Sequence, residues 1–246
     1  MTVIVAARCR DGAVIGADSQ STEMTAQVKW QVDKLFPLGS SMVWGASGQT
    51  AIIAELRSTL DSSIEILEKS PALHRSVQNL LQPEIERQYK RFLSPPGMQP
   101  QTAATGAVIC GTRESGPFII EVEPNGLCAE LDRDWYATGS GAGFAYSAGS
   151  MLEHLGLRNR SVAQGTLMVF RALRAVISTS MFGVGEPIQI WQVTAEFGCK
   201  LLDEAAIKTL DQQLSALQEI EQDGLARVVG EGSGPEEALP EAIEPV

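Results

Sequence analysis

Residues 2–18, TVIVAARCRDGAVIGAD, combine two apolar runs with a polar turn between them. The runs over 3–9 and 13–18 are rich in β-forming residues, and an Asp-Gly step between two such runs is a strong signal for a β-hairpin. Residues 33–46, DKLFPLGSSMVWGA, predict a second hairpin that turns over residues 37–41. Because these apolar runs are nearly continuous rather than alternating, we expect their strands to be covered on both faces.

Beyond residue 48 the apolar spacing changes from strand-like to helical over 49–69 and 71–93. The remaining expected elements are strands at 106–112, 117–123 and 127–130, a strand, glycine-rich turn and helix over 135–155, a helix over 161–180, strands at 187–194 and 198–202, and a helix over about 203–222. Hairpin-linked strands that alternate with helix pairs predict an α+β fold. We expect a four-layer αββα sandwich, in which helices flank two stacked antiparallel sheets.

A chain of 246 residues, 44% of them hydrophobic, can bury one substantial core. We therefore expect a single domain over residues 2–222. The segment from Gly230 onward holds five glutamates, three prolines and no basic residue. Residues 223–246 are accordingly predicted to be an acidic tail without stable structure.

Charge and composition exclude several classes of function. Thirty acidic against nineteen basic residues give a net charge of −11, which disfavours binding to nucleic acid or to anionic lipid. The sequence has neither a signal-peptide pattern nor about 20 consecutive apolar residues, so we expect a cytoplasmic protein without a membrane partner. The four cysteines are isolated from one another and predict free thiols rather than a zinc site or disulfides. The sequence contains two histidines, which disfavours a histidine-dependent catalytic triad or a metal site with several histidine ligands.

A glycine-rich stretch, Gly139-Ser140-Gly141-Ala142-Gly143, follows an expected strand and opens an expected helix. A GxGxxG pattern counted from Gly139 would place Phe144 at its last position, so the stretch departs from dinucleotide-binding loops. Two interpretations remain. The stretch is either a tight helix start that needs small residues or a turn that presents backbone amides and the Ser140 hydroxyl.

Thr2 offers chemistry of a different kind. If Met1 is removed, Thr2 carries a hydroxyl and a free α-amine on adjacent carbons. Such an amine has an ordinary pKa of about 7.7–8.0, and a nearby lysine would lower it by like-charge repulsion. Thr2 could then serve as nucleophile and base together without a histidine. A catalytic terminus must be held rigidly, and a strand that starts next to residue 2 would do this.

The spacing of Thr2, Asp18, Lys34 and Gly48 resembles that of β-type proteasome subunits and their bacterial relatives, which are Ntn hydrolases with an N-terminal threonine. The resemblance continues through ATGSGAGFA at 137–145 to QIWQV at 189–193. One region differs, because the acid that family members usually carry shortly before the strand that matches QIWQV has no counterpart in Ser178–Gly185. In this chain the acid-free stretch is followed by V-G-x-P-I at residues 184–188. This combination resembles the bacterial proteasome-related group called Anbu.

The resemblance implies a role for each matching residue. Thr2 would be the nucleophile and its amine the proton shuttle, with Lys34 as the neighbouring positive charge and Asp18 as the partner of Lys34. The Gly48 amide would donate to the oxyanion, and Ser140 would hydrogen-bond near the Thr2 amine. The hydroxyl of Thr179 or Ser180 could replace the missing acid. The side-chain pocket for substrate would be lined by Ser21, Val32, Ala46 and Thr50, which favours an apolar residue before the scissile bond.

The function that follows from the resemblance is a threonine endopeptidase that acts on polypeptides or peptides and self-associates into rings. No cofactor or metal is implied, and an ATP-dependent unfoldase is left open as a partner. Two alternatives remain at this point. One is an Ntn amidase that acts on a small amide, and the other is a catalytically silent ring or scaffold subunit, which the missing acid favours.

Overall fold

The computed structural model describes residues 2–23, 28–93, 105–150, 156–179 and 183–230. Most of the loop expected over 94–106 lies outside these residues, as do Ser180 and the part of the expected tail from residue 231 onward.

One antiparallel sheet holds the N-terminal hairpin at its centre. Its strand order is β10-β1-β2-β11-β12, with bounds β10 (Trp135–Thr138), β1 (Ile4–Arg8), β2 (Gly12–Asp18), β11 (Ile188–Thr194) and β12 (Gly198–Leu201). In this register Ile4 lies opposite Ala17 on one side and Thr138 on the other. The start of β1 is therefore flanked by the end of β2 and the end of β10.

The second sheet is also antiparallel and has the order β5-β6-β7-β8-β9. Its strands are β5 (Leu35–Leu38), β6 (Met42–Ser47), β7 (Gly106–Arg113), β8 (Gly116–Val122) and β9 (Cys128–Glu130). The expected hairpin over 33–46 is confirmed as β5 and β6. A separate two-stranded hairpin, β3 (Gln20–Glu23) with β4 (Val28–Gln31), was not expected, because these short segments are largely polar and lack an apolar run.

Alternation along β1 shows how the layers are stacked. Val3 and Val5 belong to a core cluster shared with helices. Ile4 and Ala6 belong to a cluster shared with the second sheet, where Val108 is one of their neighbours. Both faces of β1 are thus buried, as the continuous apolar run predicts.

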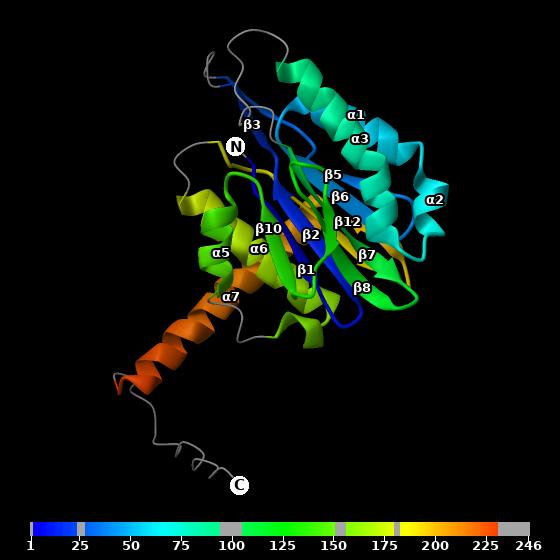
Figure 1. The fold of residues 1–246 in the computed structure, drawn as a ribbon. Helices are drawn as coiled ribbons and strands as arrows, with labels where there is room; N and C mark the ends of the chain where they lie inside the picture. The colour runs from blue at the N-terminus through cyan, green and yellow to red at the C-terminus, as the bar shows by residue number, and fades with distance from the viewer. Residues whose placement is uncertain (1, 24–27, 94–104, 151–155, 180–182, 231–246) are drawn as a thin grey trace.

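Helices cover the outer face of each sheet (Figure 1). The helices α1 (Thr50–Asp61), α2 (Ile64–Glu68) and α3 (Leu73–Leu93) pack on the second sheet, and α5 (Ala142–Ser150), α6 (Val162–Thr179) and α7 (Glu204–Val228) pack on the first. The predicted four-layer αββα sandwich is confirmed. A short 3₁₀ turn over Leu157–Asn159 precedes α6.

Two helix boundaries differ from the sequence prediction. The single helix expected over 49–69 is interrupted after Asp61, where the Ser62 hydroxyl donates to the Thr59 carbonyl at 3.0 Å and competes with helical pairing. At the other end of the chain, α7 continues to Val228, so the first six residues assigned to the tail are helical. Leu225, Ala226 and Arg227 favour helix, which explains this extension.

Candidate active site

Thr2 lies two residues before β1, and its backbone contacts the glycine-rich segment that follows β10. Its backbone nitrogen donates to the Ser140 hydroxyl oxygen at 3.0 Å. Its carbonyl oxygen accepts from the Gly141 amide at 3.0 Å. Two hydrogen bonds to residues far away in sequence therefore hold residue 2 in place.

The glycines of this turn are needed because the backbone of residue 2 approaches them closely. Gly139 has a φ of +93°, and a Cβ at this position would lie well within 3.0 Å of the Thr2 carbonyl oxygen. A Cβ on Gly141 would lie 2.9 Å from the Val3 Cβ. Since α5 begins directly afterward at Ala142, both sequence interpretations hold: the turn starts a helix and also presents an amide and a hydroxyl to Thr2.

Gly139→Ala tests this close approach. We expect any activity that depends on Thr2 to fall by roughly 100-fold. A side chain at position 139 would push the Thr2 carbonyl away, and a displacement of about 1 Å at a reacting group can lower a rate by that factor. We also expect a loss of about 1–3 kcal/mol in the free energy of unfolding from the strained backbone. Gly143→Ala is the matched control, since a Cβ there meets nothing within 4 Å. Equal effects in both variants would contradict this interpretation.

A buried ion pair lies beside the start of β1. Asp18 is fully buried and Lys34 is 7% exposed. Asp18 Oδ1 accepts from Lys34 Nζ at 2.7 Å and from the Val3 amide at 2.9 Å. Because one carboxylate oxygen binds both donors, the ammonium group of Lys34 lies next to the backbone of residue 3 and hence close to Thr2.

Burial lowers the pKa of Lys34 below its ordinary value, and the neighbouring Asp18 carboxylate opposes this shift by Coulomb attraction and a hydrogen bond. The other carboxylate oxygen of Asp18 accepts from the amides of Gln20 at 3.2 Å and Gly185 at 3.3 Å. The carboxylate is thus satisfied on both oxygens, which is what a buried charge requires.

Three supporting residues were not found by sequence reasoning. The Gln20 carbonyl accepts from Lys34 Nζ at 2.8 Å. The Gln189 side chain accepts from the Lys34 amide at 3.0 Å and donates to the carboxylate of Asp33. Gly185 reaches Asp18 through its amide. These contacts join segments up to 167 residues apart in sequence, so no local sequence pattern predicts them.

No hydrogen bond joins Thr2 to the described residues of the acid-free stretch before β11, which are 178–179 and 183–185. The Thr179 hydroxyl donates to the Ala175 carbonyl of its own helix at 2.8 Å. Ser180 lies outside the described residues. The described part of this stretch reaches the site through Gly185 and Asp18 instead.

An open groove of about 480 Å³ brings Thr2, Gly48 and Ser140 together. Gly48 has a φ of +141°, a region that favours glycine, and it lies shortly before α1. The lining of the groove also includes Glu121 and Tyr136. Three of the five predicted catalytic residues therefore share one solvent-open space, and the other two form the ion pair next to it.

Glu121 and Glu123 are the charged side chains among the described residues that line this groove. The Tyr136 hydroxyl donates to Glu121 Oε1 at 2.5 Å. Burial and, second, this hydrogen bond raise the pKa of Tyr136 above its ordinary range. The Asn125 side chain donates to Glu123 at 3.1 Å. The described partners of the two glutamates, Tyr136 and Asn125, are both neutral. The side chains that line the groove therefore give it a negative charge.

Comparison with known proteins places this architecture in a family. A family profile described as "Proteasome subunit" matches residues 2–188. The chain belongs to the proteasome subunit family. The resemblance inferred from Thr2, Asp18, Lys34 and Gly48 is thereby confirmed at the level of the family.

A solved structure of similar fold is an Anbu (Gly-1) mutant from Hyphomicrobium sp. strain MC1. It is 16% identical to this proteasome-family chain, with a TM-score of 0.70, and the match covers 92% of this chain and 97% of the other. The search of curated proteins found no match. At this identity the likeness to the Anbu structure supports the fold alone.

The four residues expected to line a substrate pocket lie in different environments in this proteasome-family chain. Ala46 is 3% exposed and packs in the cluster beneath α1, whereas Thr50 is exposed at the start of that helix. Ser21, on β3, and Val32 are half-buried. The described lining of the groove includes none of the four, so their role as a pocket stays a prediction.

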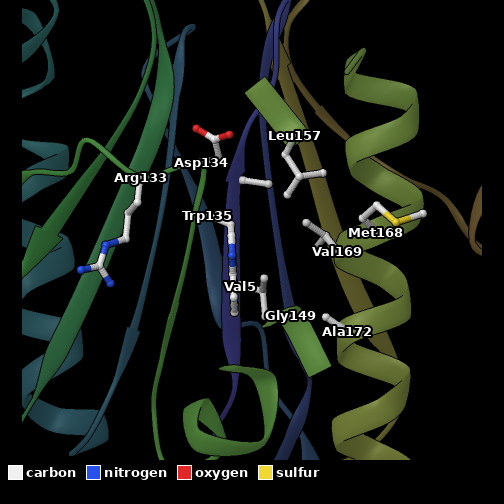
Figure 2. Close-up of a pocket in the computed structure, with 10 residues that line it drawn as sticks. Val5, Arg133, Asp134, Trp135, Gly149, Leu157, Met168, Val169 and Ala172 are labelled. Atoms are coloured by element: carbon white, nitrogen blue, oxygen red, sulfur yellow. The ribbon is translucent and has the colours of Figure 1, made fainter. Parts of the chain in front are cut away.

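A second cavity, of about 230 Å³, lies between the first sheet and α6 (Figure 2). Its lining is mostly apolar and includes Val5, Leu157, Met168 and Val169. None of the nine site residues predicted from the sequence lines the described part of this cavity. Among the described helices of this proteasome-family chain, none is sufficiently long and apolar to cross a bilayer.

Proposed function

We propose that this chain is a threonine peptidase that hydrolyses peptide bonds with Thr2 as its nucleophile and that it works in a ring assembly. The observation that carries the proposal is the position of residue 2. Its nitrogen is bound to Ser140, and the buried Lys34–Asp18 pair lies beside it. Family membership supports this class of activity.

The chemistry begins once Met1 has been removed, so that the nitrogen of Thr2 becomes a primary amine beside Ser140. The amine takes the proton from Thr2 Oγ as Oγ attacks a peptide carbonyl. The positive charge of Lys34 keeps the amine unprotonated by like-charge repulsion, and Asp18 keeps Lys34 charged. The Gly48 amide donates to the oxyanion, a contact that is commonly worth about 3–4 kcal/mol.

The reaction then follows two steps of acyl transfer. The tetrahedral intermediate collapses with its C–N bond broken, the leaving amine receives the proton, and an ester joins the substrate acyl group to Thr2 Oγ. Water attacks this ester with the Thr2 amine as base. The products are a carboxylic acid and free Thr2.

An amidase for a small amide is a weaker proposal, because the groove is open and about 480 Å³ in volume, which suits an extended chain. The scaffold alternative is supported by the missing acid but opposed by the intact Asp18–Lys34 pair. Unfolded casein separates the proposals: a peptidase degrades it, an amidase leaves it intact while it cleaves a small amide, and a scaffold does neither. Casein left intact by the purified assembly would contradict the proposal.

The charge of the groove leads to a prediction about substrates. We expect fluorogenic peptides with a basic residue next to the cleavage site to be preferred about fivefold over their neutral analogues, since a partly exposed charge pair contributes up to about 1 kcal/mol. Glu123→Gln should reduce this preference. Glu114→Gln, in the turn between β7 and β8, is the control. A preference for apolar residues, as Ser21, Val32, Ala46 and Thr50 suggest, would overturn this expectation.

A further inference from the structure

The apolar cavity between the first sheet and α6 is separate from the groove that contains Thr2. Its volume is about 230 Å³, and its described lining shares no residue with that of the groove. Val5 and Ala7 of β1 line one wall. Val169 and Ala172 of α6 line the wall opposite (Figure 2). Since protein interiors are packed as densely as organic crystals, with few voids larger than a water molecule, an apolar space of this size needs an explanation.

Small side chains leave this space unfilled. Ala7 and Ala172 are 0% and 3% exposed, so each is buried at the cavity wall without reaching across it. A larger aliphatic side chain at either position would occupy the space. Aliphatic walls do not hold an ordered water in place, because a buried water needs about two to four polar partners. The walls are therefore suited to an apolar molecule.

Trp135 of β10 forms a rigid third wall. Its ring contacts the Tyr146 ring at a centroid distance of 5.1 Å. It also covers Gly149 of α5 so closely that a Cβ on this glycine would lie well within 3.0 Å of the ring. Figure 2 shows the Trp135 ring edge-on, with one face turned toward Val169 and Ala172. Because α5 holds the ring in place, Trp135 presents a flat aromatic surface to the cavity instead of filling it.

The charged side chains at the rim of the cavity do not require an ionic ligand. These are Arg133, which is exposed, and Asp134, which is half-buried. Both carboxylate oxygens of Asp134 accept from Arg158, at 2.8 Å from Nε and 3.2 Å from the backbone amide. An ion that moved past this rim would lose its hydration and gain only aliphatic and aromatic neighbours. The cavity therefore favours an uncharged ligand.

The volume limits the size of that ligand. An apolar cavity of about 150 Å³ binds benzene or xenon, so a cavity of about 230 Å³ accommodates a molecule somewhat larger than benzene. Aromatic rings that meet in offset or edge-to-face geometry gain free energy beyond the burial of their area.

We propose that this cavity binds one small, uncharged aromatic molecule of about the size of indole, packed against the face of Trp135 that is turned toward α6. The inference goes beyond the proposed peptidase activity and does not depend on it.

Calorimetric titration of the full chain with indole tests the proposal directly. We expect one indole per chain with a Kd of about 0.1–1 mM, which is ordinary for a ligand of this size. Heptanol is the aliphatic comparison and should bind about fivefold more weakly, because it makes no ring contact with Trp135. Benzylamine is the cationic comparison and should bind at least about 100-fold more weakly, because its ammonium group would be buried without a partner. Absence of indole binding, or equal binding of either comparison, would overturn the proposal.

Two cavity-filling variants test the location of the site. Ala7→Ile and Ala172→Leu should each lower the affinity for indole at least about tenfold, because the added carbons occupy the space that the ligand needs. Circular dichroism checks that each variant folds. Ala163→Leu is the matched control, since residue 163 is exposed on the same helix as Ala172, and it should bind indole as the unaltered chain does. Unchanged binding in the filled variants would contradict the assignment of the cavity.

The position of the ligand can also be determined without a variant. In crystals of the unaltered chain soaked with bromoindole, we expect an anomalous bromine peak inside the cavity, between Trp135 and Val169. A peak that occurs only elsewhere, or no peak at all, would overturn the proposal whether or not the filled variants fold.

Discussion

Thr2→Ala is expected to lower kcat/KM for peptide hydrolysis by at least about 1,000-fold while the fold remains intact, because the variant lacks the only hydroxyl that the mechanism uses as nucleophile. The Thr2 side chain is half-exposed in the groove, so its truncation leaves no buried cavity. The backbone hydrogen bonds of residue 2 to Ser140 and Gly141 are also retained. Activity should therefore fall without a change in Tm.

Thr2→Ser is the matched variant, since serine keeps a hydroxyl on the same carbon. It should keep a substantial part of the activity. Intact mass checks that Met1 is removed from all three proteins, because a retained Met1 would itself block the amine. Full activity in Thr2→Ala with Met1 removed would contradict the assignment of the nucleophile.

Lys34→Met is expected to reduce the free energy of unfolding by about 3–5 kcal/mol and to abolish activity. The stability loss follows because Asp18 would remain as a fully buried carboxylate without its cation. Activity would be lost because the positive charge beside the Thr2 amine disappears. Chemical denaturation followed by circular dichroism measures the first effect, and peptide hydrolysis measures the second.

The double variant Asp18→Asn with Lys34→Met separates the two effects. Removal of both charges should restore much of the stability, since no unpaired charge is left, but activity should stay lost. Lys200→Met, an exposed lysine on β12, is the control for both readouts. Recovery of activity in the double variant would show that Lys34 acts only through the fold.

The layers of the fold were predictable because they follow from local patterns. The continuous apolar runs around Val5 and Val43 required burial on two faces, and the change to helical spacing after residue 48 marked the first helix. The hairpin of β3 and β4 was not predictable, because a segment such as Gln20–Glu23 has no apolar face. The end of α7 was missed because the tail predicted from the acidic, proline-containing composition after Gly230 was extended back to residue 223.

The site was predictable to the extent that its residues follow the spacing of a known family. Thr2, Asp18, Lys34, Gly48 and Ser140 were chosen in this way, and the structure brings them to one end of the first sheet. Gln189 of β11 binds Lys34 through its side chain, and Gly185, in the segment before β11, binds Asp18 through its backbone amide. Their contacts depend on the register of two strands that are more than 150 residues apart in sequence, and local patterns do not determine that register.

The central claim is that Thr2 is a live N-terminal nucleophile, and the intact mass of the purified protein before and after incubation with a peptide epoxyketone tests it most directly. This probe forms its ring adduct only with a hydroxyl and a free amine on the same terminal residue. We expect loss of Met1 and one adduct per chain at Thr2, with none in Thr2→Ala. A chain that retains Met1, or a free Thr2 that does not react, would contradict the account and favour a silent ring subunit.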